Sequence, residues 1–90
     1  MSKRQKLIQQ WRESPPAEED FDKIRSTLEH FGFTFRTLGK HPVASHPDLN
    51  DNPSFLMGGI TIPTVSGRKV KRYYLSRIVE ALEYLGAYES

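Results

Sequence analysis

The sequence of 90 residues has no cysteine and no apolar run of the length that a membrane-spanning helix requires. Without cysteine the chain forms no disulfide framework, no thiolate nucleophile and no cysteine-based zinc site. A spanning helix needs about 20 consecutive apolar residues, and the basic start at residues 1–6 lacks the apolar segment of a signal peptide. We therefore expect a cytoplasmic protein that makes no membrane contact.

A large excess of charge is also missing, since the net charge is only +2, but the charges are sorted along the chain. Residues 3–12 carry bases without acids, and residues 13–22 carry acids without bases. A second basic run consists of Arg68, Lys69, Lys71, Arg72 and Arg77. A charge run is usually a solvated face, but this second basic run is dense and begins a helix. It therefore predicts an anionic partner.

Apolar residues at steps of three and four predict three helices. The first covers about residues 3–12 and ends at the Ser-Pro-Pro of residues 14–16. We expect it to be an appendage, docked on the domain or held by a partner, rather than part of the core. The second helix spans about residues 20–31, with Asp20 as its N-cap. The third runs from about residue 71 to residue 85.

Between the second and third helices the pattern changes to that of strands. Apolar and polar residues alternate over residues 33–38, and Gly39-Lys40 suits the loop of a tight hairpin before a second strand that begins at His41. Residues 47–53 have turn composition and are expected to be a mobile loop. A third strand is expected within residues 55–62. These elements indicate an α+β domain, in which two helices cover one face of a three-stranded antiparallel sheet.

Several short motifs in this order resemble the HicA-type toxins of bacterial toxin–antitoxin pairs. They are Gly32-Phe33, Gly39-Lys40-His41, His46-Pro47, Ile62-Pro63 and Gly67-Arg68-Lys69-Val70-Lys71, together with the last helix. The resemblance covers about residues 21–85. It implies a double-stranded-RNA-binding-like α-β-β-β-α fold over residues 20–90, preceded here by an extra N-terminal helix and acidic linker at residues 1–19.

The resemblance also implies an activity, a partner and a catalytic residue. HicA toxins cleave mRNA, and a HicB antitoxin blocks them. The histidine of the family's Gly-Ser-His motif falls on His41, which makes His41 the expected catalytic residue. Here Lys40 replaces the serine and Pro42 follows the histidine, so a non-catalytic RNA-binding module and a protein that docks an acidic partner remain alternatives. Because proline cannot donate to a ladder, Pro42 is expected at an edge or a bulge.

The chemistry of RNA cleavage needs a proton acceptor, a proton donor and cations. An imidazole titrates at about pH 6.5, so His41 can serve as general acid or base. The candidates for RNA binding are Lys40, Arg36, Arg68, Lys69, Lys71 and Arg72, of which the last four lie at or near a helix N-terminus that favours anions. His46 and His30 are given structural roles. No metal-ligand spacing is found, so no metal or cofactor is expected, and the free protein is expected to be a monomer.

Overall fold

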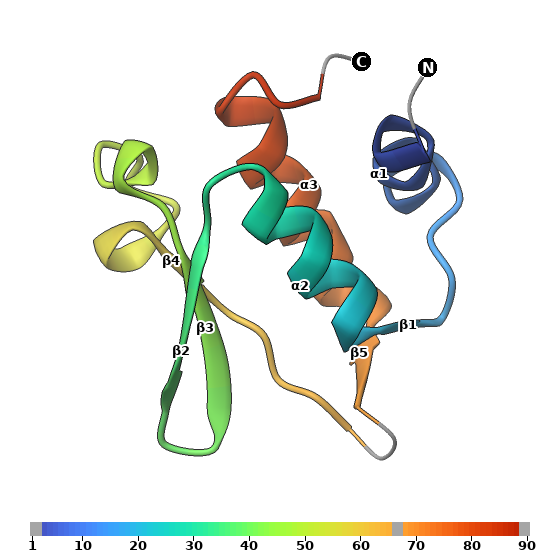
Figure 1. Cartoon of the computed structure of the whole chain (residues 1–90), viewed down its shortest axis with the longest axis horizontal. Coiled ribbons are helices and arrows are strands. Elements are labelled where there is room, and N and C mark those ends of the chain that lie inside the picture. The colour runs from blue at the N-terminus through green and yellow to red at the C-terminus, as the bar shows by residue number, and fades with distance from the viewer. Residues whose placement is uncertain (1–2, 66–67, 89–90) are drawn as a thin grey trace.

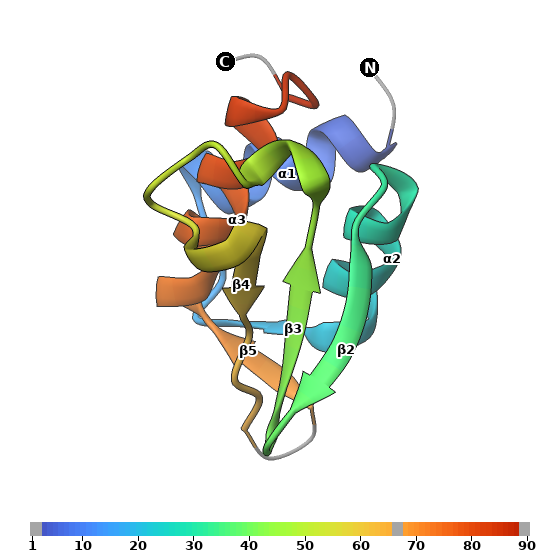
Figure 2. The ribbon, with the colours of Figure 1, turned by 90° about the vertical axis from the view of Figure 1, so that its left-hand side faces the viewer.

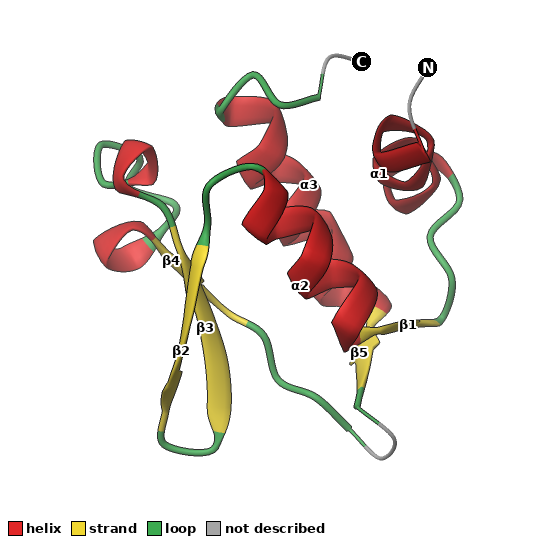
Figure 3. Cartoon of the chain, in the orientation of Figure 1, coloured by secondary structure: helices red, strands yellow, loops and turns green. Residues whose placement is uncertain are grey.

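A computed structural model of the chain describes residues 3–65 and 68–88. The helices are α1 (Lys3–Glu13), α2 (Phe21–His30) and α3 (Arg72–Tyr84), with short 3₁₀ turns η1 (Pro47–Leu49) and η2 (Leu56–Gly58). The strands are β1 (Glu18–Asp20), β2 (Thr34–Leu38), β3 (His41–Ser45), β4 (Gly59–Thr61) and β5 (Lys69–Lys71) (Figures 1 and 3). The predicted α+β class is confirmed. No helix within the described ranges is long and apolar enough to cross a bilayer.

The antiparallel sheet β2-β3-β4 forms one layer of the molecule. Leu38 pairs with His41, so Gly39 and Lys40 form the hairpin loop as predicted, with Gly39 at φ +65°. This left-handed conformation suits glycine because it has no Cβ. Figures 1 and 2 show α2 and α3 on one side of the sheet, and no α-helix of the described residues covers its other side.

Pro42 lies in the central strand β3, which differs from the expected edge or bulge. Its carbonyl accepts a hydrogen bond from the Ile62 amide at 2.9 Å, so the backbone of Pro42 faces the β4 side of the strand. Strand β4 has already ended at Thr61 at this level. A proline is tolerated here because its missing N–H would have pointed just beyond the end of the ladder.

The acidic linker is not an open connection, because it forms a small second sheet with the basic run. Strand β1 pairs antiparallel with β5, with Glu18 opposite Lys71 and Asp20 opposite Lys69. Asp20 occupies the N-cap position of α2, but its side chain makes no capping hydrogen bond and instead forms an ion pair with Lys69. The sequence analysis missed this pair of strands.

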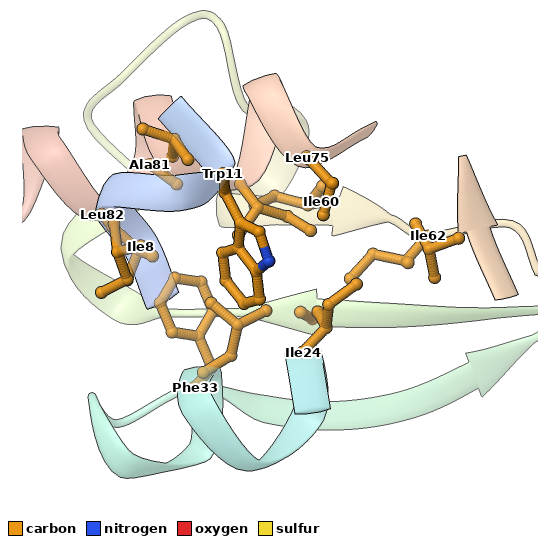
Figure 4. Packing of buried hydrophobic residues seen from close by; sticks show 14 of the residues in the cluster. Ile8, Trp11, Ile24, Phe33, Ile60, Ile62, Leu75, Ala81 and Leu82 are labelled. Atoms are coloured by element: carbon orange, nitrogen blue, oxygen red, sulfur yellow. The ribbon is translucent and has the colours of Figure 1, made fainter. Parts of the chain in front are cut away.

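Helix α1 contributes to the core, contrary to the expectation that it is an appendage. Ile8 and Trp11 are both buried and belong to the main hydrophobic cluster. Figure 4 shows them pointing from α1 into the same cluster as Ile24 and Phe33. Burying large apolar side chains contributes about 1.5–3 kcal/mol each, so α1 stabilises the domain directly.

The segment between β3 and β4 was expected to be a mobile loop, but it is packed against the core. Leu49 and Phe55 are buried in the core and fix the two ends of this connection. Gly58 completes it at φ +73°, where an added Cβ would lie 2.3 Å from Asn50 Oδ1. The connection is therefore a packed structure that requires glycine at this point.

Candidate nucleic-acid interface

His41 and Arg36 share the uncovered face of the sheet. Side chains alternate along a strand, and Ala44 is buried on the side of the helices, which places Val43 and His41 on the opposite side. Arg36 pairs with Val43 and therefore lies on the same side as His41. The two residues are diagonal neighbours, a relationship that separates such pairs by about 7–8 Å. Lys40 lies beside them in the hairpin loop.

The face of the sheet that carries His41 is called the outer face below. The polar residues that strand alternation places on this face are Thr34, Arg36, His41, Ser45 and Thr61. The Thr34 and Ser45 hydroxyl oxygens lie 3.3 Å apart across β2 and β3. None of the residues of β2, β3 and β4 carries a carboxylate. This face can therefore approach a phosphate backbone without charge repulsion from its own strands.

The His41 imidazole is exposed and has no hydrogen bond or ion pair to any other described residue. A free imidazole can accept or donate a proton. No second histidine or carboxylate is bonded to it in the described parts of the chain, so the outer face provides a single acid–base group rather than a pair.

The structural role expected for His46 is confirmed. Its Nδ1 accepts a hydrogen bond from the Asp48 amide at 3.0 Å and so caps the turn η1. Its ring packs edge-on against Phe33, with the centroids 5.2 Å apart. His30 lies in the last turn of α2, the position expected for a residue that complements the helix C-terminus.

The basic run of β5 is paired with the acidic run rather than left free. Arg68 contacts Asp22 at 3.2 Å and Lys71 contacts Glu18 at 3.1 Å, while Lys69 pairs with Asp20. The Lys69 ammonium holds the pKa of the Asp20 carboxyl below its ordinary value, chiefly through their hydrogen bond. These pairs are solvent-exposed, and such pairs are worth only about 0–1 kcal/mol.

Arg72 completes the predicted set of cations. It is the first residue of α3, and its Nε donates to the Pro16 carbonyl at 3.4 Å. Apart from Arg68, which contacts Asp22 of α2, the structure separates the predicted RNA-binding residues into two groups. Arg36 and Lys40 accompany His41 at the hairpin, whereas Lys69, Lys71 and Arg72 lie where the acidic linker meets β5 and α3.

A cleft of about 200 Å³ between α2 and β2 brings Arg36 and Arg68 together with Arg25. Arg25 was missed by the sequence analysis. Its position one turn after Phe21 on α2 is the signal that could have found it, since residues four apart share a helix face. Among the described residues, no group of three or more histidine, aspartate or glutamate side chains is placed to hold a metal ion.

Comparison with known proteins identifies no relative, because no family model, no curated protein and no solved structure matches the chain. The HicA resemblance therefore depends on the motifs of the sequence alone.

Proposed function

We propose that this chain is the toxin of a toxin–antitoxin pair, a HicA-like endoribonuclease that cleaves mRNA in the cytoplasm without a metal and uses His41 as general acid and base. The observation that carries the proposal is the outer face, where an unpaired His41 lies diagonal to Arg36 and beside Lys40 on strands free of carboxylates. Apart from the short strand β5 between β4 and α3, the order of helices and strands from α2 to α3 is the one expected for the double-stranded-RNA-binding-like fold that the resemblance implies.

In the proposed reaction the neutral His41 imidazole accepts the proton of a ribose 2′-OH. The 2′-oxygen then attacks the adjacent phosphorus, and the bond to the 5′-oxygen breaks as the imidazolium returns a proton to it. The products are a 2′,3′-cyclic phosphate and a 5′-hydroxyl. Arg36 and Lys40 stabilise the negative charge that develops on the phosphorane oxygens. A HicB-like antitoxin is the proposed protein partner, and the free toxin is proposed to be a monomer.

The second candidate function is a non-catalytic RNA-binding module of the same fold. The observation that favours it is the isolation of His41, because no other described acid–base side chain is bonded to it and Lys40 stands where the resembled family has serine. This candidate predicts RNA binding without cleavage.

The test compares purified wild-type protein with His41→Ala and with His30→Ala on the same RNA. His30 is a matched control because it is exposed on α2, away from the hairpin. We expect cleavage and growth arrest to be lost only in His41→Ala, with the free energy of unfolding changed by no more than about 0.5 kcal/mol. Undiminished cleavage by a folded His41→Ala variant removes His41 from the mechanism. Binding without cleavage by the wild type supports the second candidate.

A further inference from the structure

We propose that the cleft between α2 and β2 binds a phosphodiester group of the RNA strand through Arg25, Arg36 and Arg68. The inference rests on the proposed RNA substrate, but the cleft faces α2 rather than the outer face and does not include His41. It would add a second point of contact for the RNA backbone, on the other side of β2 from the site of cleavage.

Aromatic rings hold two of the guanidinium groups in place. The Arg25 Cζ lies 5.6 Å from the centroid of the Phe35 ring, and the Arg68 Cζ lies 5.1 Å from that of Phe21. The two rings pack edge to face, 5.7 Å apart. A guanidinium stacked on a ring keeps its N–H groups available in the plane, so this arrangement orients donors before any ligand arrives.

The carboxylates that pair with these arginines do not line the cleft. Glu29 contacts Arg25 at 3.3 Å and Asp22 contacts Arg68 at 3.2 Å, but neither acid is a lining residue. Each guanidinium has several donors, so an exposed contact with one carboxylate leaves others free. Arg36 has no ion pair with any described residue. The lining is therefore cationic without an opposing acid.

The backbone of β2 adds neutral donors. The Ile62 amide donates to the Pro42 carbonyl and the His46 amide to the Gly58 carbonyl, so alternate residues of β3 face β4. The residues between them face β2, and their partners there include Arg36 and Leu38. In an antiparallel pair the intervening residues of β2, Phe35 and Thr37, then direct their N–H groups to the free edge. Both residues line the cleft.

Arg68 has an unusual backbone conformation for an arginine, with φ +56°. Its carbonyl accepts a hydrogen bond from the Phe21 amide at 2.9 Å, which holds it against the start of α2. Non-glycine residues in this region cost backbone energy and are enriched at ligand sites. This conformation is a third observation, beside the stacked guanidiniums and the open strand edge, that points to a ligand.

Arg36 connects the cleft with the site of cleavage. Strand alternation directs its Cβ to the outer face, yet it also lines the cleft, because β2 is an edge strand. An RNA strand that crosses this edge can place one phosphate in the cleft and a neighbouring phosphate beside His41. The chemical class of the ligand is therefore a phosphodiester of single-chain RNA backbone rather than a base.

The test measures RNA binding at several salt concentrations in a His41→Ala background, which removes the proposed cleavage. The double variant Arg25→Gln/Arg68→Gln keeps Arg36, which the proposed function places beside His41, and is compared with the control Lys3→Gln/Lys6→Gln, which removes the same charge from exposed positions of α1. Figure 1 shows α1 on the opposite side of the molecule from the hairpin. We expect at least a tenfold loss of affinity in the first variant only. Its log–log salt slope should fall by roughly 0.7 for each contact removed.

An amide NMR titration identifies the source of the phosphate. Perturbation of the Thr37 amide by an oligoribonucleotide is expected, and its loss in Arg25→Gln/Arg68→Gln supports the proposal. Perturbation by inorganic phosphate but not by the oligoribonucleotide would assign the cleft to free phosphate and overturn the RNA assignment. Equal loss of affinity in the control variant, or no loss in either, also overturns it.

The outcomes separate this inference from the proposed function. If cleavage depends on His41 but the arginine variant binds RNA as tightly as its parent, the proposed function stands and the cleft is not an RNA-binding site. If the wild-type protein binds RNA through the cleft but does not cleave it, the cleft proposal stands and the proposed nuclease activity is refuted. Far-UV circular dichroism of each variant verifies that the comparison is made on folded protein.

Discussion

The indole Nε1 of Trp11 donates a hydrogen bond to Glu19 Oε2 at 3.0 Å inside the protein. Both residues are buried, and glutamate is almost never fully buried unless it is paired. The other carboxylate oxygen of Glu19 accepts a hydrogen bond from the Asp20 amide at 2.8 Å. Glu19 therefore joins α1 to the start of α2, and the bond explains why the first helix belongs to the core.

Replacement of Trp11 by phenylalanine is expected to destabilise the protein by about 1–3 kcal/mol, because it leaves a buried acceptor without its donor. Lost apolar volume adds to this cost. Urea unfolding followed by far-UV circular dichroism measures the change. The control is Lys23→Gln, which removes a cation 3.9 Å from Glu19 at an exposed position and should cost no more than about 0.5 kcal/mol. Equal effects of the two changes would show that the Trp11–Glu19 hydrogen bond does not stabilise the protein.

The Asp20–Lys69 pair predicts how stability depends on pH. The pair lowers the pKa of Asp20 from its ordinary value of 3.8 and raises that of Lys69 from 10.5. A lowered carboxyl pKa contributes stability above the unfolded value, and this contribution is lost as the pH falls through the folded pKa. A raised lysine pKa contributes stability below 10.5 that is lost as the pH rises through the folded pKa.

The pH prediction is tested with Asp20→Asn, whose stability should fall less steeply than that of the wild type on the acid side. NMR titration of the Asp20 carboxyl measures the pKa directly. A value at or above 3.8 would contradict the prediction.

Cleavage of RNA is expected to need no divalent metal, because the sequence offers no cluster with ligand spacing. Activity should persist in EDTA at the rate measured without it. Asp48 and Asp51, in the loop after β3, are the carboxylates to test if activity is lost. Loss in EDTA that is restored by magnesium or manganese would refute metal independence.

The basic run of β5 is predicted to bind phosphates in competition with the acidic linker. Lys69→Gln/Lys71→Gln should weaken binding similarly for unrelated RNA sequences, since phosphate contacts carry no base information. Glu18→Gln/Asp20→Asn should have the opposite effect, because it frees the same two lysines. If RNA affinity is unchanged in both variants while antitoxin binding is lost in the first, this surface docks the antitoxin instead.

Gly58 is predicted to be the least replaceable of the glycines in the loops beside the sheet. An added Cβ would lie 2.3 Å from Asn50 Oδ1 and 2.9 Å from the His46 carbonyl oxygen. Gly58→Ala should therefore cost more than about 2 kcal/mol through strain and displaced neighbours. Gly39→Ala is the control, because φ is +65° there but no atom lies within 4 Å of the added Cβ. Thermal or urea unfolding of both variants gives the comparison, and equal losses would contradict it.

The hairpin and the amphipathic helices could be predicted because each is determined by neighbours in the sequence. Gly39-Lys40 fixes the turn, and residues three and four apart define the buried sides of α2 and α3. Val70 is the one apolar residue within residues 68–72, among the cations of its run, and it is fully buried. His41, Arg36 and Lys40 meet because they lie on the same hairpin.

The pairing of β1 with β5 could not be predicted in the same way. Each strand is only three residues long and too short for a clear alternation of apolar residues. The matching feature is charge, since Glu18 and Asp20 have the same two-residue spacing as Lys69 and Lys71. Acidic and basic runs so distant in sequence can equally well lie on separate solvent-exposed surfaces, so complementary charge alone does not predict that they pair. For the same reason the cleft remained hidden, because Arg25, Arg36 and Arg68 come from three separate elements.

The contact of the first elements with the last has a consequence for synthesis on the ribosome. Helix α1 packs on α3, and β1 pairs with β5. In the sequence β5 comes only after all three strands of the central sheet, so β1 cannot pair until β5 has been synthesised. The hairpin that carries His41 can form early from local contacts, whereas contacts between distant segments form slowly. Until α3 has emerged, Trp11 and Ile8 lack the full core against which they are buried. A nascent chain should therefore remain sensitive to proteases until its last helix is made. If the protein is the proposed toxin, the same dependence delays the appearance of folded toxin beside the ribosome that made it.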